Sequence, residues 1–127
     1  MLNDIYIPEH PLNQTPLVDF KTSGELKIIG KSFPEDPVTF YEPLIEWIQK
    51  LKNNCPPTIN MTVKLDYFNT STSKLLLLLF KRLEDIFLSG KSKIKITWLY
   101  NKNDEDQLDS GIDYESIIEI PFELVEY

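Results

Sequence analysis

Alternating apolar and polar residues predict a series of short strands. Ile59, Met61, Val63 and Leu65 alternate with polar residues, which is typical of a strand with one buried face and one wet face. The same alternation recurs over residues 94–100. Residues 17–20 and 26–29 flank a Thr-Ser-Gly turn, which predicts a hairpin. Further strands are expected at residues 5–7 and 117–125, the last of them interrupted or begun at Pro121.

Apolar residues at helical spacing predict a first helix that begins at a clear signal. Asp36 followed by Pro37 fits an N-cap and a proline at the first helical position. Pro43 lies inside the span and predicts either a bend or a regular helix that begins only near Glu42. The expected apolar stripe comprises Phe40, Leu44, Trp47, Ile48 and Leu51.

Two more helices are predicted in the second half of the chain. A polar loop over residues 69–73 precedes a helix from about Lys74 to Leu88, with Gly90 as its stop. The acidic residues 104–109 predict a short helix that ends near Gly111. The expected core side of the longer helix comprises Leu76, Leu79, Phe80, Leu83 and Phe87.

The order of these elements predicts the fold class. Strands that alternate with helices indicate an α/β protein with a mixed sheet and at least some parallel pairs. Continuous apolar strands, typical of a sheet covered on both faces, are missing. We therefore expect one two-layer domain over residues 1–127, with the main helices packed on one face of the sheet.

Composition and charge narrow the classes of function. The formal net charge of −7 and the lack of a basic patch argue against nucleic-acid binding. The longest apolar run has six residues, at 75–80, whereas a membrane span needs about 20. Residues 1–8 are polar and interrupted by proline, unlike a secretory leader. We therefore expect a cytoplasmic protein that neither crosses nor binds a membrane.

Catalytic, metal and cofactor signals are weak. The single histidine, His10, has no local partner to orient it, and Cys55 has no nearby base. The four glycines are scattered and form no phosphate loop. Residues 101–106 alternate oxygen ligands, but the sixth position is Asp106 where a calcium loop requires glycine. We expect no catalytic residue, no metal and no cofactor, and hence a protein that is not an enzyme.

A run of hydroxyl side chains, Thr70 to Ser73, has two explanations. These residues precede an apolar helix, so they are good N-cap candidates, and composition alone favours this explanation. A hydroxyl between a strand and a helix is also accessible to a kinase, and helix amides and Lys74 would favour a phosphate there. The residues alone leave both explanations open.

The chain resembles the SiaC family of bacterial regulatory phosphoproteins. The resemblance rests on residues 40–47, 65–74 and 121–127, and the segment Tyr67-Phe68-Asn69-Thr70-Ser71 is its most specific part. The acidic residues 104–106 before a glycine also fit, and the similarity covers nearly the whole chain. The resemblance implies a fold like that of STAS-type anti-sigma-factor antagonists.

The resemblance also implies a non-enzymatic switch. A serine/threonine kinase would phosphorylate Thr70, with Ser71 as the second candidate, and a PP2C-type phosphatase would remove the phosphate. The unphosphorylated form would bind and activate a diguanylate cyclase, which raises cyclic di-GMP and favours biofilm growth. The expected partner-binding residues are Tyr67, Phe68, Asn69, Thr70, Ser71 and Lys74. Because the hydroxyl run continues through Thr72 and Ser73, a neighbouring hydroxyl is an alternative acceptor.

Two other functions stay open on the sequence. One is a constitutive protein-interaction domain, or an anti-sigma-factor antagonist with another output partner, in which the hydroxyl run is only a helix cap. The other is an enzyme or a small-ligand binder with a pocket beneath the open face of the sheet. The lack of paired catalytic groups argues against an enzyme, whereas a ligand pocket needs no such groups.

Overall fold

The structure is a computed structural model, and it describes residues 2–127. Six strands form one mixed sheet in the order β1-β2-β3-β4-β5-β6. The strands β1 (Ile5–Ile7), β2 (Leu17–Phe20) and β3 (Glu25–Ser32) pair in antiparallel fashion. The strands β4 (Thr58–Phe68), β5 (Lys93–Tyr100) and β6 (Phe122–Glu126) continue the sheet in parallel with β3. Chain order and sheet order are therefore the same.

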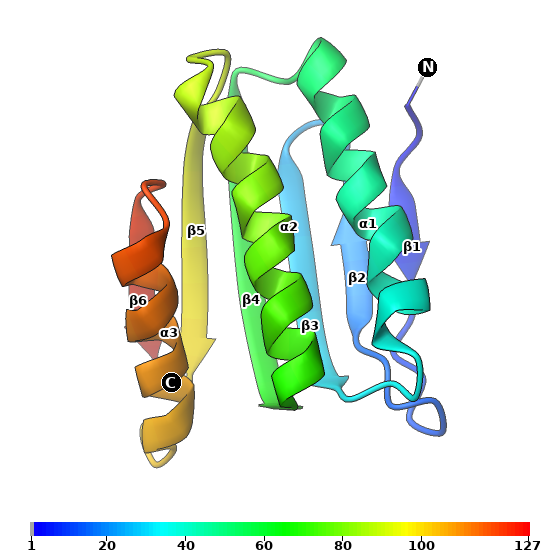
Figure 1. The fold of residues 1–127 in the computed structure, drawn as a ribbon, viewed down its shortest axis with the longest axis vertical. Coiled ribbons are helices and arrows are strands. Elements are labelled where there is room, and N and C mark those ends of the chain that lie inside the picture. The colour runs from blue at the N-terminus through cyan, green and yellow to red at the C-terminus, as the bar shows by residue number, and fades with distance from the viewer. Residues whose placement is uncertain (1) are drawn as a thin grey trace.

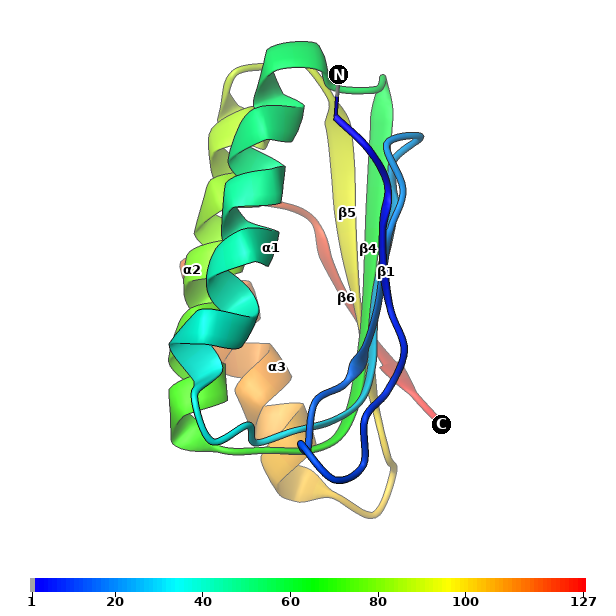
Figure 2. The same cartoon turned by 90° about the vertical axis from the view of Figure 1, so that its right-hand side faces the viewer.

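Helices cover one face of this sheet. The helices α1 (Pro37–Leu51), α2 (Thr70–Leu88) and α3 (Glu105–Ile117) each connect two neighbouring parallel strands, and a short 3-10 turn η1 (Lys52–Asn54) follows α1. Figure 1 shows the three helices side by side in front of the strands. Figure 2 shows two layers with the opposite face of the sheet uncovered. The predicted two-layer α/β fold with a mixed sheet is thus confirmed.

The core lies between the sheet and the helices. The alternation that predicted β4 places Ile59, Met61, Val63 and Leu65 on the covered face, where all four are buried. On α2, four of the five expected core residues are buried and Phe87 is half-buried. Four of the five stripe residues predicted for α1 are buried, and Phe40 packs half-buried at their edge.

The start of α1 follows its sequence signal. The Asp36 side chain accepts a hydrogen bond from the Thr39 amide at 3.2 Å, and Pro37 is the first helical residue. The helix runs without interruption through Pro43, which is exposed, so its ring points to solvent. The expectation of a helix beginning only near Glu42 is wrong, because the cap fixes the first turn six residues before Pro43.

Two predicted boundaries are wrong. Helix α2 begins at Thr70 rather than near Lys74. Helix α3 continues through Gly111 to Ile117 instead of ending near the glycine. Asn69 caps the earlier start of α2, and close packing continues α3 beyond its local stop signal. The last strand begins at Phe122, directly after Pro121, which agrees with the predicted alternative of a start at Pro121.

Gly111 shows the physical reason for the longer α3. A Cβ atom at this position would lie 2.6 Å from Trp98 Cδ1 and 2.7 Å from Leu124 Cδ2. The glycine therefore permits the close approach of α3 to β5 and β6, and it does not end the helix. The end of α3 lies six residues later, where the Ile118 amide bonds to the Tyr114 carbonyl at 2.9 Å.

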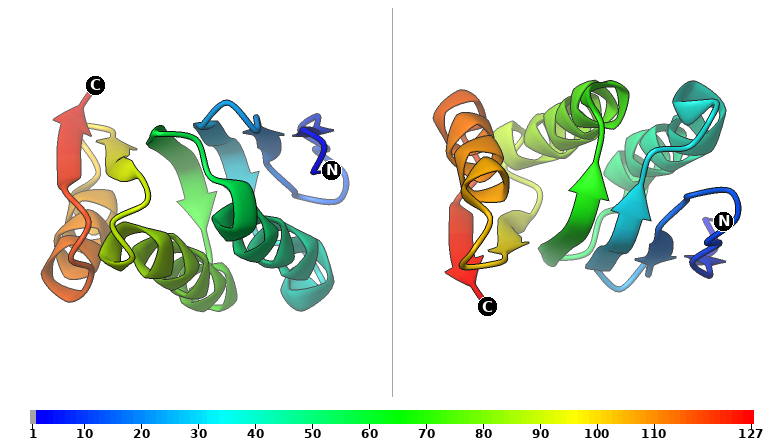
Figure 3. Two further views of the ribbon diagram at one scale, coloured as in Figure 1. Left: turned by 90° about the horizontal axis from the view of Figure 1, so that it is seen from above. Right: turned by 90° about the horizontal axis from the view of Figure 1, so that it is seen from below.

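The carboxyl ends of β3, β4 and β5 meet at one end of the molecule. Figure 3 shows this end from below, with the first turn of α2 and the start of α3 beside each other. In α/β sheets, ligand and partner sites form at the carboxyl ends of parallel strands. The segment predicted to bind a partner lies at this end.

Candidate functional site

The first turn of α2 contains the four hydroxyl residues and is capped by Asn69. The Asn69 side chain accepts a hydrogen bond from the Thr72 amide at 3.0 Å, and the Ser73 amide bonds to the Asn69 carbonyl at 3.0 Å. We call residues 70–73 the hydroxyl turn. The cap explanation was therefore right about the helix end, but the capping side chain is Asn69 and not one of the hydroxyls.

The hydroxyl turn divides into two structural and two free side chains. Thr72 is fully buried, and its hydroxyl donates to the Ser32 carbonyl at 2.9 Å. Ser73 is half-buried, and its hydroxyl lies 3.0 Å from that of Tyr114. Thr70 and Ser71 are exposed, and neither side chain forms a hydrogen bond with any of the described residues. Within the hydroxyl turn, Thr70 and Ser71 are therefore the side chains most accessible to a modifying enzyme.

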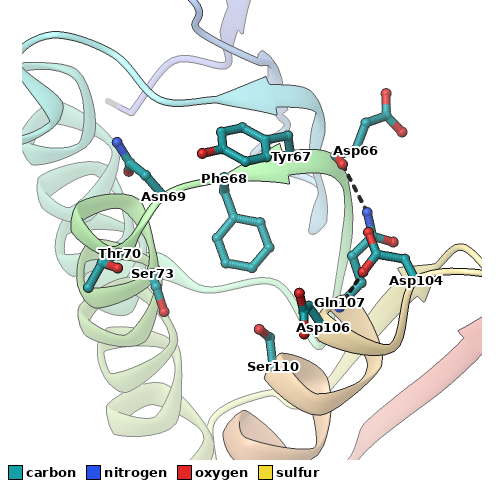
Figure 4. A pocket seen from close by; sticks show the side chains of 10 residues that line it. All are labelled: Asp66, Tyr67, Phe68, Asn69, Thr70, Ser73, Asp104, Asp106, Gln107 and Ser110. Atoms are coloured by element: carbon teal, nitrogen blue, oxygen red, sulfur yellow. Dashed lines mark hydrogen bonds between the residues drawn. The ribbon is translucent and has the colours of Figure 1, made fainter.

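A pocket of about 300 Å³ lies beside the hydroxyl turn. Figure 4 shows its two walls, one from the end of β4 and the start of α2, the other from the start of α3. Its lining residues are Asp66, Tyr67, Phe68, Asn69, Thr70, Ser73, Asp104, Asp106, Gln107 and Ser110. The pocket therefore joins segments that are more than 30 residues apart in the chain.

Four of the six residues predicted to bind a partner line this pocket. Tyr67 is 54% exposed and packs edge-on against Phe33, with ring centroids 4.9 Å apart. Phe68 is half-buried and packs edge-on against Trp98 at 5.7 Å. Asn69 and Thr70 complete this wall. Ser71 and Lys74 are exposed on α2 but do not line the pocket.

The wall from α3 was not predicted as part of the site. Asp104 caps α3 by accepting a hydrogen bond from the Gln107 amide at 3.1 Å. Gln107 is buried, and its side-chain amide donates to the Leu65 and Asp66 carbonyls, both at 3.0 Å. Its side-chain oxygen accepts from the Asn101 amide at 2.8 Å. The acidic residues 104–106 were the only sequence signal for this wall.

The pocket carries negative charge. Asp66, Asp104 and Asp106 contribute three carboxylates, and no lysine or arginine is among the lining residues. The Tyr127 hydroxyl donates to Asp66 at 3.2 Å, and Lys64 lies 4.7 Å from the centre of the Tyr127 ring. Burial, and then the charge of Asp66, raise the pKa of Tyr127 above its ordinary value, so the hydroxyl stays a donor.

Two buried tyrosines lie on either side of the hydroxyl turn, and only Tyr114 bonds to it directly. The Tyr41 hydroxyl lies 2.6 Å from that of Ser32, which in turn lies 3.1 Å from that of Thr72. On the other side, the Tyr114 hydroxyl donates to the Ser73 carbonyl at 2.8 Å. Burial raises the pKa of both tyrosines, that of Tyr114 to about 12, so both remain protonated hydroxyls at neutral pH.

Groups for catalysis or metal binding do not converge at this pocket. Within residues 2–127, no group of three or more His, Cys, Asp or Glu side chains is placed to hold a metal ion. His10 is exposed, and its ring accepts a hydrogen bond from the Asn13 amide at 3.1 Å. Cys55 is a half-buried free thiol.

A comparison with family models decides the family. Residues 9–127 match the model of the SiaC family, described as SiaC family regulatory phosphoproteins. The chain belongs to the SiaC family. An uncharacterised protein of Pseudomonas aeruginosa strain UCBPP-PA14 is 23% identical over 123 residues, which cover 95% of this chain and 94% of that protein.

Solved structures of SiaC share the fold. SiaC of Pseudomonas aeruginosa superposes with a TM-score of 0.86 at 21% identity, covering 98% of both chains. A crystal structure of the diguanylate cyclase SiaD in complex with its activator SiaC, also from Pseudomonas aeruginosa, gives a TM-score of 0.86 at 21% identity. That match covers 98% of this chain and 100% of the matched chain. The resemblance to STAS-type proteins is compatible with this fold and stays a prediction.

In residues 2–127, no helix combines the length and the apolar composition that a crossing requires.

Proposed function

We propose that this SiaC family member is a non-enzymatic adaptor whose partner binding is switched by phosphorylation of Thr70. The proposal rests on the difference in exposure and hydrogen bonding among the four residues of the hydroxyl turn. Thr72 and Ser73 are held by hydrogen bonds, whereas Thr70 and Ser71 are exposed. Of the two exposed hydroxyl residues, only Thr70 lines the pocket. Thr70 is therefore the preferred acceptor and Ser71 the second candidate.

The charge of the pocket supports a switch that releases the partner. A phosphate on Thr70 would add about −1.5 to −2 charges at neutral pH to a pocket that already holds three carboxylates. Against an apolar or acidic partner surface, an unpaired charge at an interface costs about 2 to 5 kcal/mol. The aromatic rings of Tyr67 and Phe68 form the neutral part of the surface that would dock.

The effector is proposed from the relatives. SiaC of Pseudomonas aeruginosa is named as the activator of the diguanylate cyclase SiaD in the crystal structure of their complex. We infer that the unphosphorylated form of this chain also binds and activates a diguanylate cyclase, and so acts in cyclic di-GMP signalling and biofilm formation in the cytoplasm. A serine/threonine kinase and a PP2C-type phosphatase would set the level of Thr70 phosphorylation.

Phosphopeptide mapping tests the acceptor. The chain is purified from its native cells in planktonic and aggregated states, and the peptide with Thr70 is analysed for an adduct of about 80 Da. A phosphate on Thr70 that differs between the states supports the switch. An unmodified peptide in both states, with full coverage, would favour a constitutive interaction domain. If Thr70→Ala is phosphorylated to the same extent as the native chain, the acceptor is misassigned.

Capture of the effector from a lysate tests whether the chain binds and activates a diguanylate cyclase. Immobilised Thr70→Ala and Thr70→Asp variants are exposed to a native lysate, and the matched pair Ser71→Ala and Ser71→Asp serves as control. We expect Thr70→Ala to retain a diguanylate cyclase and to raise its activity. Thr70→Asp should retain it at least about tenfold less, as expected for one unpaired interfacial charge. An equal loss with Ser71→Asp would show that the pocket beside Thr70 has no special role.

A further inference from the structure

Helix α3, which forms one wall of the pocket, is held to the rest of the molecule by three residues on one of its faces. Gln107, Gly111 and Tyr114 are its buried residues, and they lie at helical spacing of four and three positions. By contrast, α1 buries six residues and α2 buries seven. The wall that carries Asp104 and Asp106 is therefore the most lightly anchored helix of the covered face.

The three residues join α3 to β4, β5 and α2. Gln107 bonds to the end of β4, and Gly111 permits close packing on Trp98 of β5. Tyr114 contacts α2, where its hydroxyl donates to the Ser73 carbonyl at 2.8 Å and lies 3.0 Å from the Ser73 hydroxyl. In the described residues, these are the only hydrogen bonds between α2 and α3.

The Tyr114 ring does not depend on its hydroxyl for packing. It packs edge-on against Phe80 at 5.1 Å and against Trp98 at 5.3 Å, and the residue is 4% exposed. Loss of the hydroxyl alone would therefore leave the ring in the core. The lost contact would be the one that joins α3 to the hydroxyl turn.

We propose that Tyr114 is a positioning residue, whose hydroxyl holds α3 against the hydroxyl turn and so sets the geometry of the pocket into which the partner docks. The pocket has Thr70 and Ser73 on one wall and Asp106 and Ser110 on the other. Gln107 already joins the two walls at the Asp66 carbonyl, so the contact between Tyr114 and Ser73 sets their distance on the side of α2. The docking part of this proposal rests on the proposed function, whereas the coupling of α3 to α2 does not.

Hydrogen exchange tests the coupling without any partner. Amide exchange is measured by mass spectrometry for the native chain, Tyr114→Phe, Ser73→Ala and the matched control Tyr41→Phe. Tyr41 is also a buried tyrosine bonded to a serine, but on the far side of the turn from the pocket. We expect Tyr114→Phe to speed exchange in residues 105–117 by about three- to tenfold, the factor that one lost hydrogen bond gives.

The expected ranking of the variants by their effect on exchange in α3 makes this test specific. Ser73→Ala removes only one of the two contacts of the Tyr114 hydroxyl, so its effect on α3 should be smaller than that of Tyr114→Phe. Tyr41→Phe should leave exchange in α3 unchanged. Unchanged exchange in Tyr114→Phe, or an equal effect from Tyr41→Phe, would overturn the proposed coupling.

Affinity for the captured diguanylate cyclase tests the docking part. We expect Tyr114→Phe to weaken binding about three- to tenfold while Tyr41→Phe binds as the native chain does, at a temperature where both are folded. If α3 loosens but affinity is unchanged, the pocket is not part of the docking surface and the proposal fails. If no cyclase is captured at all, the proposed function fails, and the exchange result still decides the coupling.

Discussion

The Thr72 hydroxyl donates a hydrogen bond to the Ser32 carbonyl, 2.9 Å away and 40 residues earlier in the chain. This bond joins the first turn of α2 to the end of β3, in a place where both residues are fully buried. Together with the Asn69 cap, this bond stabilises the start of α2 at Thr70.

The bond makes Thr72 the structural member of the hydroxyl turn. We expect Thr72→Val, which keeps the shape but removes the hydroxyl, to lower the free energy of unfolding by about 1 to 3 kcal/mol. Urea unfolding measures the loss. Ser71→Ala is the matched control, because Ser71 is exposed on the same turn, and it should stay within about 0.5 kcal/mol of the native chain. Equal stabilities for Thr72→Val and the native chain would contradict this role.

Asn69 has a capping role that can be separated from docking. We expect Asn69→Ala to lower the free energy of unfolding by about 0.5 to 2 kcal/mol, because the Thr72 amide loses its acceptor. Asn69→Asp keeps a capping oxygen and should retain most of the stability, while it adds negative charge to the pocket wall. Urea unfolding and cyclase affinity are measured on both variants. Equal loss of stability in both would show that the cap is not the source of the effect.

We expect even an alanine side chain at Gly111 to destabilise the fold. Alanine is the better helix former by about 1 kcal/mol, but overpacking of a filled core costs about 1 to 3 kcal/mol. The Trp98 ring cannot move away freely, because its Nε1 donates to the Gln107 carbonyl at 2.9 Å. Gly111→Ala should therefore lower the melting temperature, whereas Ser110→Ala on the same helix should not. A melting temperature that rises in Gly111→Ala would contradict the close packing of α3.

Stability at alkaline pH should depend on Tyr114. The pKa of Tyr114 is raised from its ordinary value of 10.0 to about 12, chiefly by burial. Because the folded chain holds this proton more tightly than the unfolded chain, the stabilisation is complete below pH 10 and is lost as the pH rises through 12. A shift of about two pKa units corresponds to about 3 kcal/mol.

Urea unfolding between about pH 9 and pH 12 measures this loss, with tyrosinate absorbance as the second signal. The buried Tyr41, whose pKa is also raised by burial, should add a loss of the same sign. Tyr114→Phe should flatten the fall in stability over this range. An equally steep fall in Tyr114→Phe and the native chain would show that Tyr114 does not carry the effect.

Strand positions and the first helix could be predicted because their signals are local. Alternation in residues 59–65 depends only on which face of the sheet is buried, and Asp36 and Pro37 cap the helix that follows them directly. The segment from Tyr67 to Lys74 was also predicted as the site, on its resemblance to the SiaC family. This segment, with the residue before it, forms one wall of the pocket.

The second wall depends on contacts that no local pattern contains. Helix α3 is mostly polar, and Gly111 reads locally as a helix end, although the structure uses it for packing against Trp98. Tyr114 gave no signal as a site residue, because its partner Ser73 lies 41 residues away. Such pairs form only when the sheet order has brought α2 and α3 beside each other.

The sequence by itself determined the fold class, the covered and open faces of the sheet and the SiaC family, because each follows from periodicity or from motifs along the chain. Only the tertiary structure decided which of the four hydroxyls are free. Burial and long-range hydrogen bonds hold Thr72 and Ser73 and leave Thr70 and Ser71 exposed. Four similar side chains in a row look equivalent in the sequence, and they differ because the helix turns each toward a different neighbour.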